Sequence, residues 1–240
     1  MKKSIIILIL LCLAYSVFPQ KSSNTAPKFD VADFNKKFET AAWLVEYDFA
    51  AWKSTDEVMK QDKKELERLG KEWFCFQDKN RNWHAVYGKL VNDKYDLVFH
   101  LTVDKTGKAS VIKEKVDEKF LILHSKALET AQNQMQIALK GKDAPKFNQY
   151  IKQNADKSFS VWLLPAFQTN GVAVYGAEFV YTIDQNATKI LKDESYMQEN
   201  FRGFQTGNPR EIWLNYSETE KPTLGAIFFV WYYKPYFTNI

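Results

Sequence analysis

The chain has 240 residues, of which 45% are hydrophobic and 26% are charged, and its formal net charge is +4. These values exclude a disordered chain and a membrane protein with many spans. They also argue against a nucleic-acid partner, because lysines alternate with acidic residues, as in residues 60–65 and 113–119. The 18 Phe, 12 Tyr and 7 Trp residues predict many side chains that fill a core or line a site.

Residues 1–20 have the order of a secretory signal peptide. Two lysines precede an apolar run from Ile5 to Ala14, and small and polar residues follow it. The run is shorter than the ~20 residues that cross a bilayer, so we expect cleavage and no transmembrane span in the mature chain. The sequence therefore predicts an exported protein, periplasmic or extracellular, and its lysine-rich composition suggests a bacterial source.

Residues 21–30 form a polar leader, and residues 31–240 are expected to form a single globular domain. No internal repeat or linker is recognisable in the sequence of that domain. The mature chain keeps one cysteine, Cys75, so it cannot form an internal disulfide. Its stability must come from a hydrophobic core.

Apolar residues at helical spacing predict a helix that begins after Asp30. The following residues recur at spacings of three and four and form one wide stripe that we expect to face the core: Phe34, Phe38, Ala41, Val45, Phe49 and Trp52. Residues 54–57 resemble a capping box and predict the start of a second helix, which Gly70 would end.

The remaining sequence predicts an α+β fold. Three aromatic and β-branched runs, at 73–77, 83–91 and 95–103, predict a three-stranded antiparallel meander. Residues 116–140 predict one long helix, with His124 in its core-facing side. A C-terminal antiparallel β meander is expected over the following runs: 147–152, 158–164, 172–184, 188–196, 211–216 and 224–233.

Cys75, His84 and His100 form the candidate chemical site. If Lys79 and Asn80 make the loop of the first hairpin, Cys75 pairs directly with His84. That register would place the thiol and the imidazole on one face of the sheet.

The second hairpin decides where His100 lies. A three-residue loop over 92–94 sets Thr102 opposite His84. It also makes His100 a diagonal neighbour of His84 on the same face. A loop of two or four residues would put the histidines on opposite faces. The alternation of apolar residues favours the three-residue loop.

Two kinds of chemistry could use this cluster. His84 could withdraw the proton of Cys75, oriented by His100 or Thr102, which predicts a thiol enzyme with Cys75, His84 and Thr102 as catalytic residues. Alternatively, Cys75, His84 and His100 could bind zinc and leave a fourth position for water. The simpler interpretation is a buried apolar cysteine beside two structural histidines.

Residues 224–237 are the densest aromatic stretch of the chain. A strand this apolar is usually buried on both faces, but tyrosine and tryptophan can also stack on sugar rings or apolar ligands. This second interpretation predicts a binding groove that includes Tyr175, Glu178, Trp231 and Tyr233. Glu178 lies among apolar neighbours and is the acid expected to have the most perturbed pKa.

No nucleotide-binding loop, dinucleotide fingerprint, nucleophile elbow or helical histidine pair occurs in the sequence. The first functional hypothesis is therefore an exported binding domain that uses aromatic surfaces. Its partner would be a small molecule, a glycan or an envelope protein. The alternative is a hydrolase or a thiol- or zinc-dependent enzyme centred on Cys75, His84 and His100. No other cofactor is expected.

Overall fold

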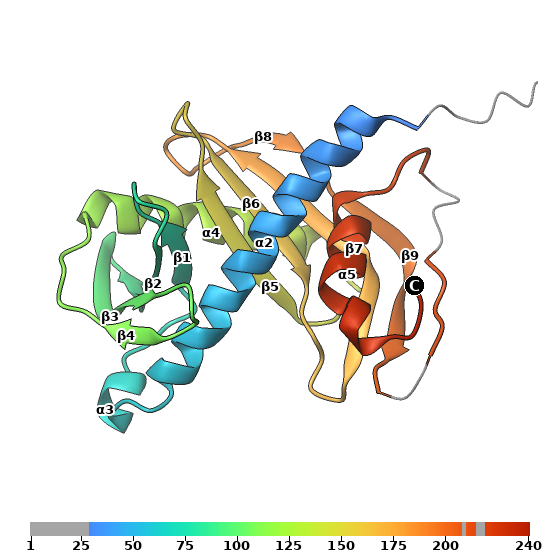
Figure 1. The fold of residues 1–240 in the computed structure, drawn as a ribbon. Helices are drawn as coiled ribbons and strands as arrows, with labels where there is room; N and C mark the ends of the chain where they lie inside the picture. The colour runs from blue at the N-terminus through green and yellow to red at the C-terminus, as the bar shows by residue number, and fades with distance from the viewer. Residues whose placement is uncertain (1–28, 208–209, 215–218) are drawn as a thin grey trace, which may run out of the picture. The chain divides into compact units, whose positions relative to one another are not determined.

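The fold consists of two successive sets of elements, each a long helix followed by an antiparallel meander (Figure 1). The computed structural model describes residues 29–207, 210–214 and 219–240. The predicted signal peptide and residues 21–28 of the leader lie outside this range. Residues 31–240 form one compact unit.

The first set pairs in the order β1-β2-β3-β4. Its elements are α2 (Val31–Val58), α3 (Lys63–Leu66), β1 (Trp73–Gln77), β2 (Trp83–Val91), β3 (Lys94–Val103) and β4 (Ala109–Val111). The predicted three-stranded meander is confirmed and gains β4 as a short edge strand.

The second set pairs in the order β5-β6-β7-β8, with β9 also paired to β7. Its elements are α4 (Glu118–Ala138), β5 (Phe147–Gln153), β6 (Phe159–Pro165), β7 (Val172–Ile183), β8 (Ile190–Asp193), β9 (Tyr196–Gln205), α5 (Leu224–Tyr233) and the 3-10 helix η1 (Lys234–Tyr236). The predicted α+β class is confirmed.

The two helix-and-meander sets share local features at matching positions. The two long helices bury side chains at matching spacings: Leu44, Tyr47, Ala50, Ala51, Ser54 and Val58 in α2, and Leu121, His124, Ala127, Leu128, Ala131 and Met135 in α4. The first turn of each meander also places a residue at positive φ, Arg81 at 65° and Lys157 at 67°. Few residues at matching positions are identical, so this similarity is not evident in the sequence.

The N-terminal helix is longer than predicted and buries a different face. It continues through the expected capping box at residues 54–57, because Ser54 donates to the carbonyl of Ala50 and so supports the helix from inside. Phe49 and Trp52 of the predicted core stripe are 42% and 57% exposed, whereas Ala41 is buried. The aromatic stripe is thus partly a surface feature.

Residues 224–233 form the helix α5, not the predicted strand. The Thr223 hydroxyl accepts the Ala226 amide and caps the helix. A run that is apolar at every position fits a buried strand and a buried helix equally well, since neither period is visible. The expected strand at 211–216 is likewise absent from its described part, where Glu211 makes only an isolated bridge to Asn239.

Among the described residues, two large hydrophobic clusters pack the sheets against the long helices, and a smaller third one packs α5 against β7. One lies against α2 and includes Leu44, Tyr47 and Leu101. The other lies against α4 and includes Phe74 and Phe159. In Figure 1, α2 crosses in front of both sheets and α4 lies behind them. Each sheet therefore packs between the two long helices.

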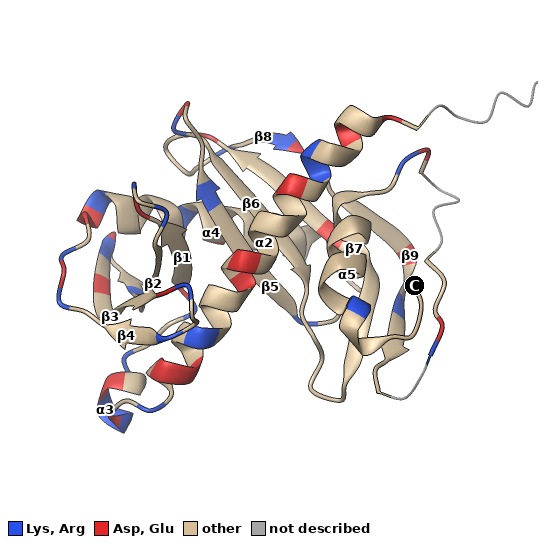
Figure 2. Ribbon diagram, in the orientation of Figure 1, with Lys and Arg blue, Asp and Glu red and all other residues tan. Residues whose placement is uncertain are grey.

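Charged residues of both signs are interspersed on the ribbon, including along α2 (Figure 2). This distribution agrees with the absence of a basic stripe in the sequence. In the part of the chain that the structure describes, no helix combines the length and the apolar character that a membrane span requires.

Candidate functional site

The first hairpin separates Cys75 from His84. Its register pairs Cys75 with Ala85, and His84 with Phe76. The prediction that Cys75 faces His84 is therefore wrong by one residue. The turn has three residues instead of two, because the Asp78 carboxylate accepts the amides of Asn80 and Asn82 and closes a wider loop.

The second hairpin brings the histidines together by an unexpected route. Its turn has two residues, Asn92 and Asp93, both at positive φ, which alone would separate the histidines. A register shift between Tyr87 and Gly88 restores the other pairing. His84 thus lies opposite Thr102, and the His84 Nδ1 lies 2.9 Å from the His100 Nε2. The predicted proximity of the two histidines is confirmed.

The histidine pair forms an ordered hydrogen-bond chain. The His100 Nδ1 lies 2.9 Å from the Glu114 carbonyl, which can only accept, so the His100 proton sits on Nδ1. The His100 Nε2 then accepts from the His84 Nδ1, and the His84 Nε2 faces the Asp78 carboxylate at 3.7 Å. Burial lowers the pKa of His100, so this ring stays neutral at neutral pH, and its two hydrogen bonds fix it as a structural group.

Cys75 lies on the opposite face of the same sheet, buried against α2. Its amide donates to the Tyr47 hydroxyl at 2.8 Å. Burial, the largest cause, raises the pKa of the thiol far above its ordinary range, so the reactive thiolate is disfavoured. The structure therefore does not assemble Cys75, His84 and Thr102 as a thiol site. Among the described residues, no group of three histidines, cysteines or acids is arranged to hold a metal ion.

The largest cavity described is a groove of about 950 Å³ between the N-terminal half of α2 and the second sheet. Such a volume suits a small molecule or a short chain of linked rings. Trp43 of α2 and Trp162 of β6 form its apolar floor, with ring centres 5.7 Å apart. The Lys152 ammonium lies 5.3 Å from the Trp43 ring centre. Ser160 and Thr182 add hydroxyl groups from neighbouring strands.

Glu178 of β7 lies at one end of this groove. Its side chain is buried, and its Oε2 accepts the Thr223 hydroxyl at 3.2 Å. Burial raises the pKa of this carboxyl to about 7, while a hydrogen bond from the Gly225 amide, the Thr223 hydroxyl and the charge of Lys37 oppose that rise. The expectation of a perturbed pKa for Glu178 is confirmed.

The start of α5 can approach Glu178 only because residue 225 is glycine. A Cβ atom at Gly225 would lie 1.9 Å from the Glu178 Oε2. The carboxyl group thereby takes a position at the positive end of the α5 dipole, where negative charge is stabilised.

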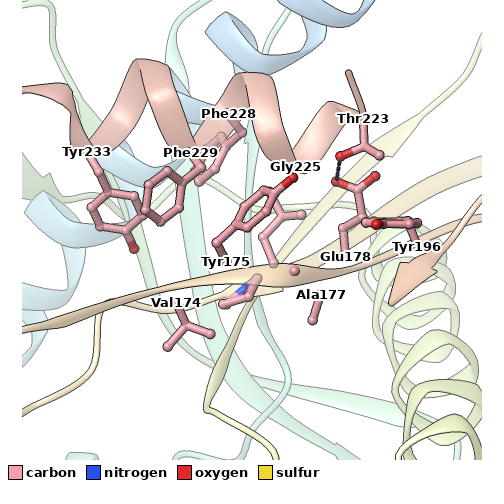
Figure 3. Close-up of a pocket in the computed structure, with 13 residues that line it drawn as sticks. Val174, Tyr175, Ala177, Glu178, Tyr196, Thr223, Gly225, Phe228, Phe229 and Tyr233 are labelled. Atoms are coloured by element: carbon pink, nitrogen blue, oxygen red, sulfur yellow. Dashed lines mark hydrogen bonds between the residues drawn. The ribbon is translucent and has the colours of Figure 1, made fainter. Parts of the chain in front are cut away.

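The structure divides the predicted ligand-binding residues. Tyr175, Glu178 and Tyr233 line one small cavity next to the groove (Figure 3). Trp231 lies on the outer side of α5, half exposed, with its ring centre 5.0 Å from that of Phe38. It does not line the groove.

Trp43, Trp162 and Lys152 were not predicted as site residues. Trp43 does not belong to the apolar stripe predicted for this helix. Its position off that stripe was the one signal in the sequence that it contacts a different neighbour. Trp162 lay within a predicted strand, but only the sheet packing shows which face meets α2. Lys152 lies one residue before the end of β5, and nothing in the local sequence indicates that it reaches the groove.

A second acid, the partly buried Asp48 of α2, was also missed. Its carboxylate accepts the hydroxyls of Tyr232 at 2.7 Å and Tyr150 at 2.9 Å, and the Asn148 amide at 3.1 Å. These bonds connect α2, α5 and β5. Because its carboxylate is fully engaged with these donors, Asp48 has a structural role.

We compared the chain with family models, curated proteins and solved structures, and none of them matches it.

Proposed function

We propose that this is a binding protein whose groove takes a glycan chain. The observation that carries the proposal is the paired tryptophan floor of the groove, bordered by hydroxyl and charged side chains. Sugar rings have apolar C–H faces and polar edges, so they suit aromatic floors with hydrogen-bonding rims.

The mixed lining favours a glycan over a purely apolar ligand. Asn154, Ser160 and Thr182 offer neutral hydrogen-bonding groups along the strands. Lys36 and Glu39 on α2 offer charged groups from the opposite wall. A lipid tail would leave these polar groups without water or partners, which is unfavourable.

Within the described part of the chain, the predicted residues are not arranged to support the enzymatic alternative. Cys75 and His84 lie on opposite faces of one sheet, and the histidines are engaged with each other. The proposal also includes export by the predicted signal peptide, where a protein could meet glycans of an envelope or its surroundings.

Isothermal titration with neutral oligosaccharides of about six sugar units tests the groove. We expect at least one of the hexamers of glucose, xylose and N-acetylglucosamine to bind the wild-type protein. The variant Thr182→Trp fills the groove from β7 and should abolish that binding. Ser110→Trp adds the same side chain to the exposed edge strand β4 and serves as the matched control. Equal binding by both variants, or no binding by the wild type, would contradict the proposal.

A further inference from the structure

A small aromatic cavity continues from the groove at Glu178. It has a volume of about 20 Å³, which is room for about one water-sized group. Glu178, Tyr196 and Thr223 line both spaces, so the cavity is an extension of the groove. We call this space the aromatic enclosure, and its walls include the rings of Tyr175, Tyr196, Phe228, Phe229 and Tyr233 (Figure 3).

Glu178 is a buried acid in the wall of this enclosure that makes no ion pair within the described residues. Lys37 is the cation whose charge reaches it, but the Lys37 ammonium is bound to the Asp33 carboxylate at 2.8 Å and to the Pro222 carbonyl at 2.9 Å. Buried carboxylates are normally paired, because an isolated buried charge is strongly unfavourable. Among the described residues, Glu178 therefore has no cation in direct contact, and the ammonium group of a ligand would supply one.

We propose that the aromatic enclosure binds a primary ammonium group of the ligand, with Glu178 as its ion-pair partner. This inference rests on the proposed glycan-binding function and specifies the ligand as a glycan that carries a free amine. The rest of the glycan lies on the tryptophan floor of the groove.

The size and chemistry of the enclosure select a primary ammonium group. An –NH₃⁺ group is about as large as a water molecule, whereas a trimethylated ammonium group exceeds the space. Aromatic faces attract cations, and Tyr196 pairs with Glu178 between β9 and β7, whereas Phe229 and Tyr233 lie farther along α5 (Figure 3). The ammonium group has three N–H donors, of which one can bond to the carboxyl oxygen of Glu178 that Thr223 does not engage.

The carboxyl group is held in place for this role before a ligand arrives. Thr223 and Gly225 fix its Oε2 at the start of α5. A preorganised partner of this kind lowers the entropic penalty of binding.

The test compares a glucosamine hexamer with its N-acetylated form by isothermal titration at pH 6.5. Acetylation removes the charge and enlarges the group but leaves the sugar chain intact. We expect the free amine to bind about tenfold tighter, as for a desolvated charged hydrogen bond. Glu178→Gln keeps the shape of the side chain and should remove this preference while binding the N-acetylated hexamer as the wild type does. That second result also shows that the variant is folded.

Glu129→Gln is the matched control, since Glu129 is an exposed acid of α4 that does not line the groove, and should keep the preference. The inference is overturned if both hexamers bind the wild type equally, or if Glu178→Gln retains the preference. Failure of every hexamer to bind contradicts the groove itself. A tripeptide Gly-Lys-Gly that binds in a Glu178-dependent manner when neither hexamer does would overturn the glycan as the source of the amine.

Discussion

The two sheets have the same plan but leave different amounts of space on their outer faces. In the first sheet, the face that carries His84 and Val86 is covered by α4 and by the chain at Glu114. In the second sheet, Ser160 and Trp162 occupy the matching positions, counted from the first turn of each meander, and they line the groove. We call the face of the first sheet that carries His84 the closed face, because α4 covers it, and the matching face of the second sheet the open face, because it lines the groove.

This contrast shows how a site can arise without catalytic residues. The closed face uses ring stacking, since Phe76 lies 5.0 Å from the His84 ring centre and 5.0 Å from that of Phe120. On the open face, Trp162 contacts Trp43 of the crossing helix, but the polar side chains of Ser160 and Thr182 next to it line the groove. Four measurements test the contrast.

The largest effect should come from the closed side. Phe74 is fully buried between Phe120 and His124, with the His124 ring centre 4.9 Å away. Phe74→Ala should lower the free energy of unfolding by about 3–5 kcal/mol, because a cavity remains. Urea denaturation measures this change. A loss below about 1 kcal/mol would mean that this core is not tightly packed.

His124 should make the closed side sensitive to acid. Burial lowers its pKa to about 4, although the bond to the Phe120 carbonyl opposes this shift. The unfolded chain then binds a proton first, so stability is complete above the ordinary histidine pKa and is lost as the pH falls toward 4. The loss should be ~3 kcal/mol.

His124→Phe should remove that acid-dependent loss. Denaturation curves at pH 7 and pH 4.5 for both proteins provide the comparison. Because Glu178 contributes in the opposite direction over this pH range in both proteins, the test is the difference between them: from pH 7 to pH 4.5 the unfolding free energy of the wild type should change unfavourably by ~3 kcal/mol relative to that of the variant. An equal change in both proteins would assign the acid sensitivity to other groups.

Glu178 should have the opposite pH dependence on the open side. Its folded pKa of about 7 is raised, so the folded state holds its proton more tightly than the unfolded state. Its contribution to stability is therefore present at low pH and is lost as the pH rises from about 4.5 to 7. The loss should be about 2–3 kcal/mol. Glu178→Gln should remove this decline in unfolding free energy. A variant that declines like the wild type would contradict the burial of the acid.

The smallest effect is expected from substitutions of two threonines at matching positions of the two sheets. Thr102 lies opposite His84 on the closed face, and Thr182 lies in the groove. Thr102→Trp should destabilise the protein by about 1–3 kcal/mol through overpacking, whereas Thr182→Trp should cost less than ~1 kcal/mol. Thermal and urea denaturation can rank the two. The reverse ranking would show that the groove is the more tightly packed face.

Much of the fold could be predicted because its signals are local. The helix at 118–138 follows from apolar spacing, and β1, β2, β3, β5, β6 and β7 follow from aromatic and β-branched runs between turn residues. The short strand β4 and most of β9 were not predicted. The helix α5 could not be predicted in the same way. Its sequence is apolar on every side, and its Thr223 cap is a single hydroxyl that also occurs in loops.

The candidate site was less predictable because it depends on register and packing. One extra residue in the turn after Asp78 moved Cys75 away from His84. A bulge at Gly88 brought the histidines together despite a two-residue turn. The groove requires knowing that α2 crosses the second sheet, and no local pattern contains that information. The burial of Glu178 could be predicted from the sequence, since it is a single acid in an otherwise apolar strand.

The most direct test of the account is to locate the bound glycan by NMR. Each tryptophan indole N–H gives its own resonance, and Trp43 and Trp162 lie on the groove floor whereas Trp52 and Trp231 lie outside it. Titration with a hexamer that binds should shift the indole signals of Trp43 and Trp162 and leave those of Trp52 and Trp231 in place. Shifts confined to Trp52 and Trp231 would contradict the groove as the binding site.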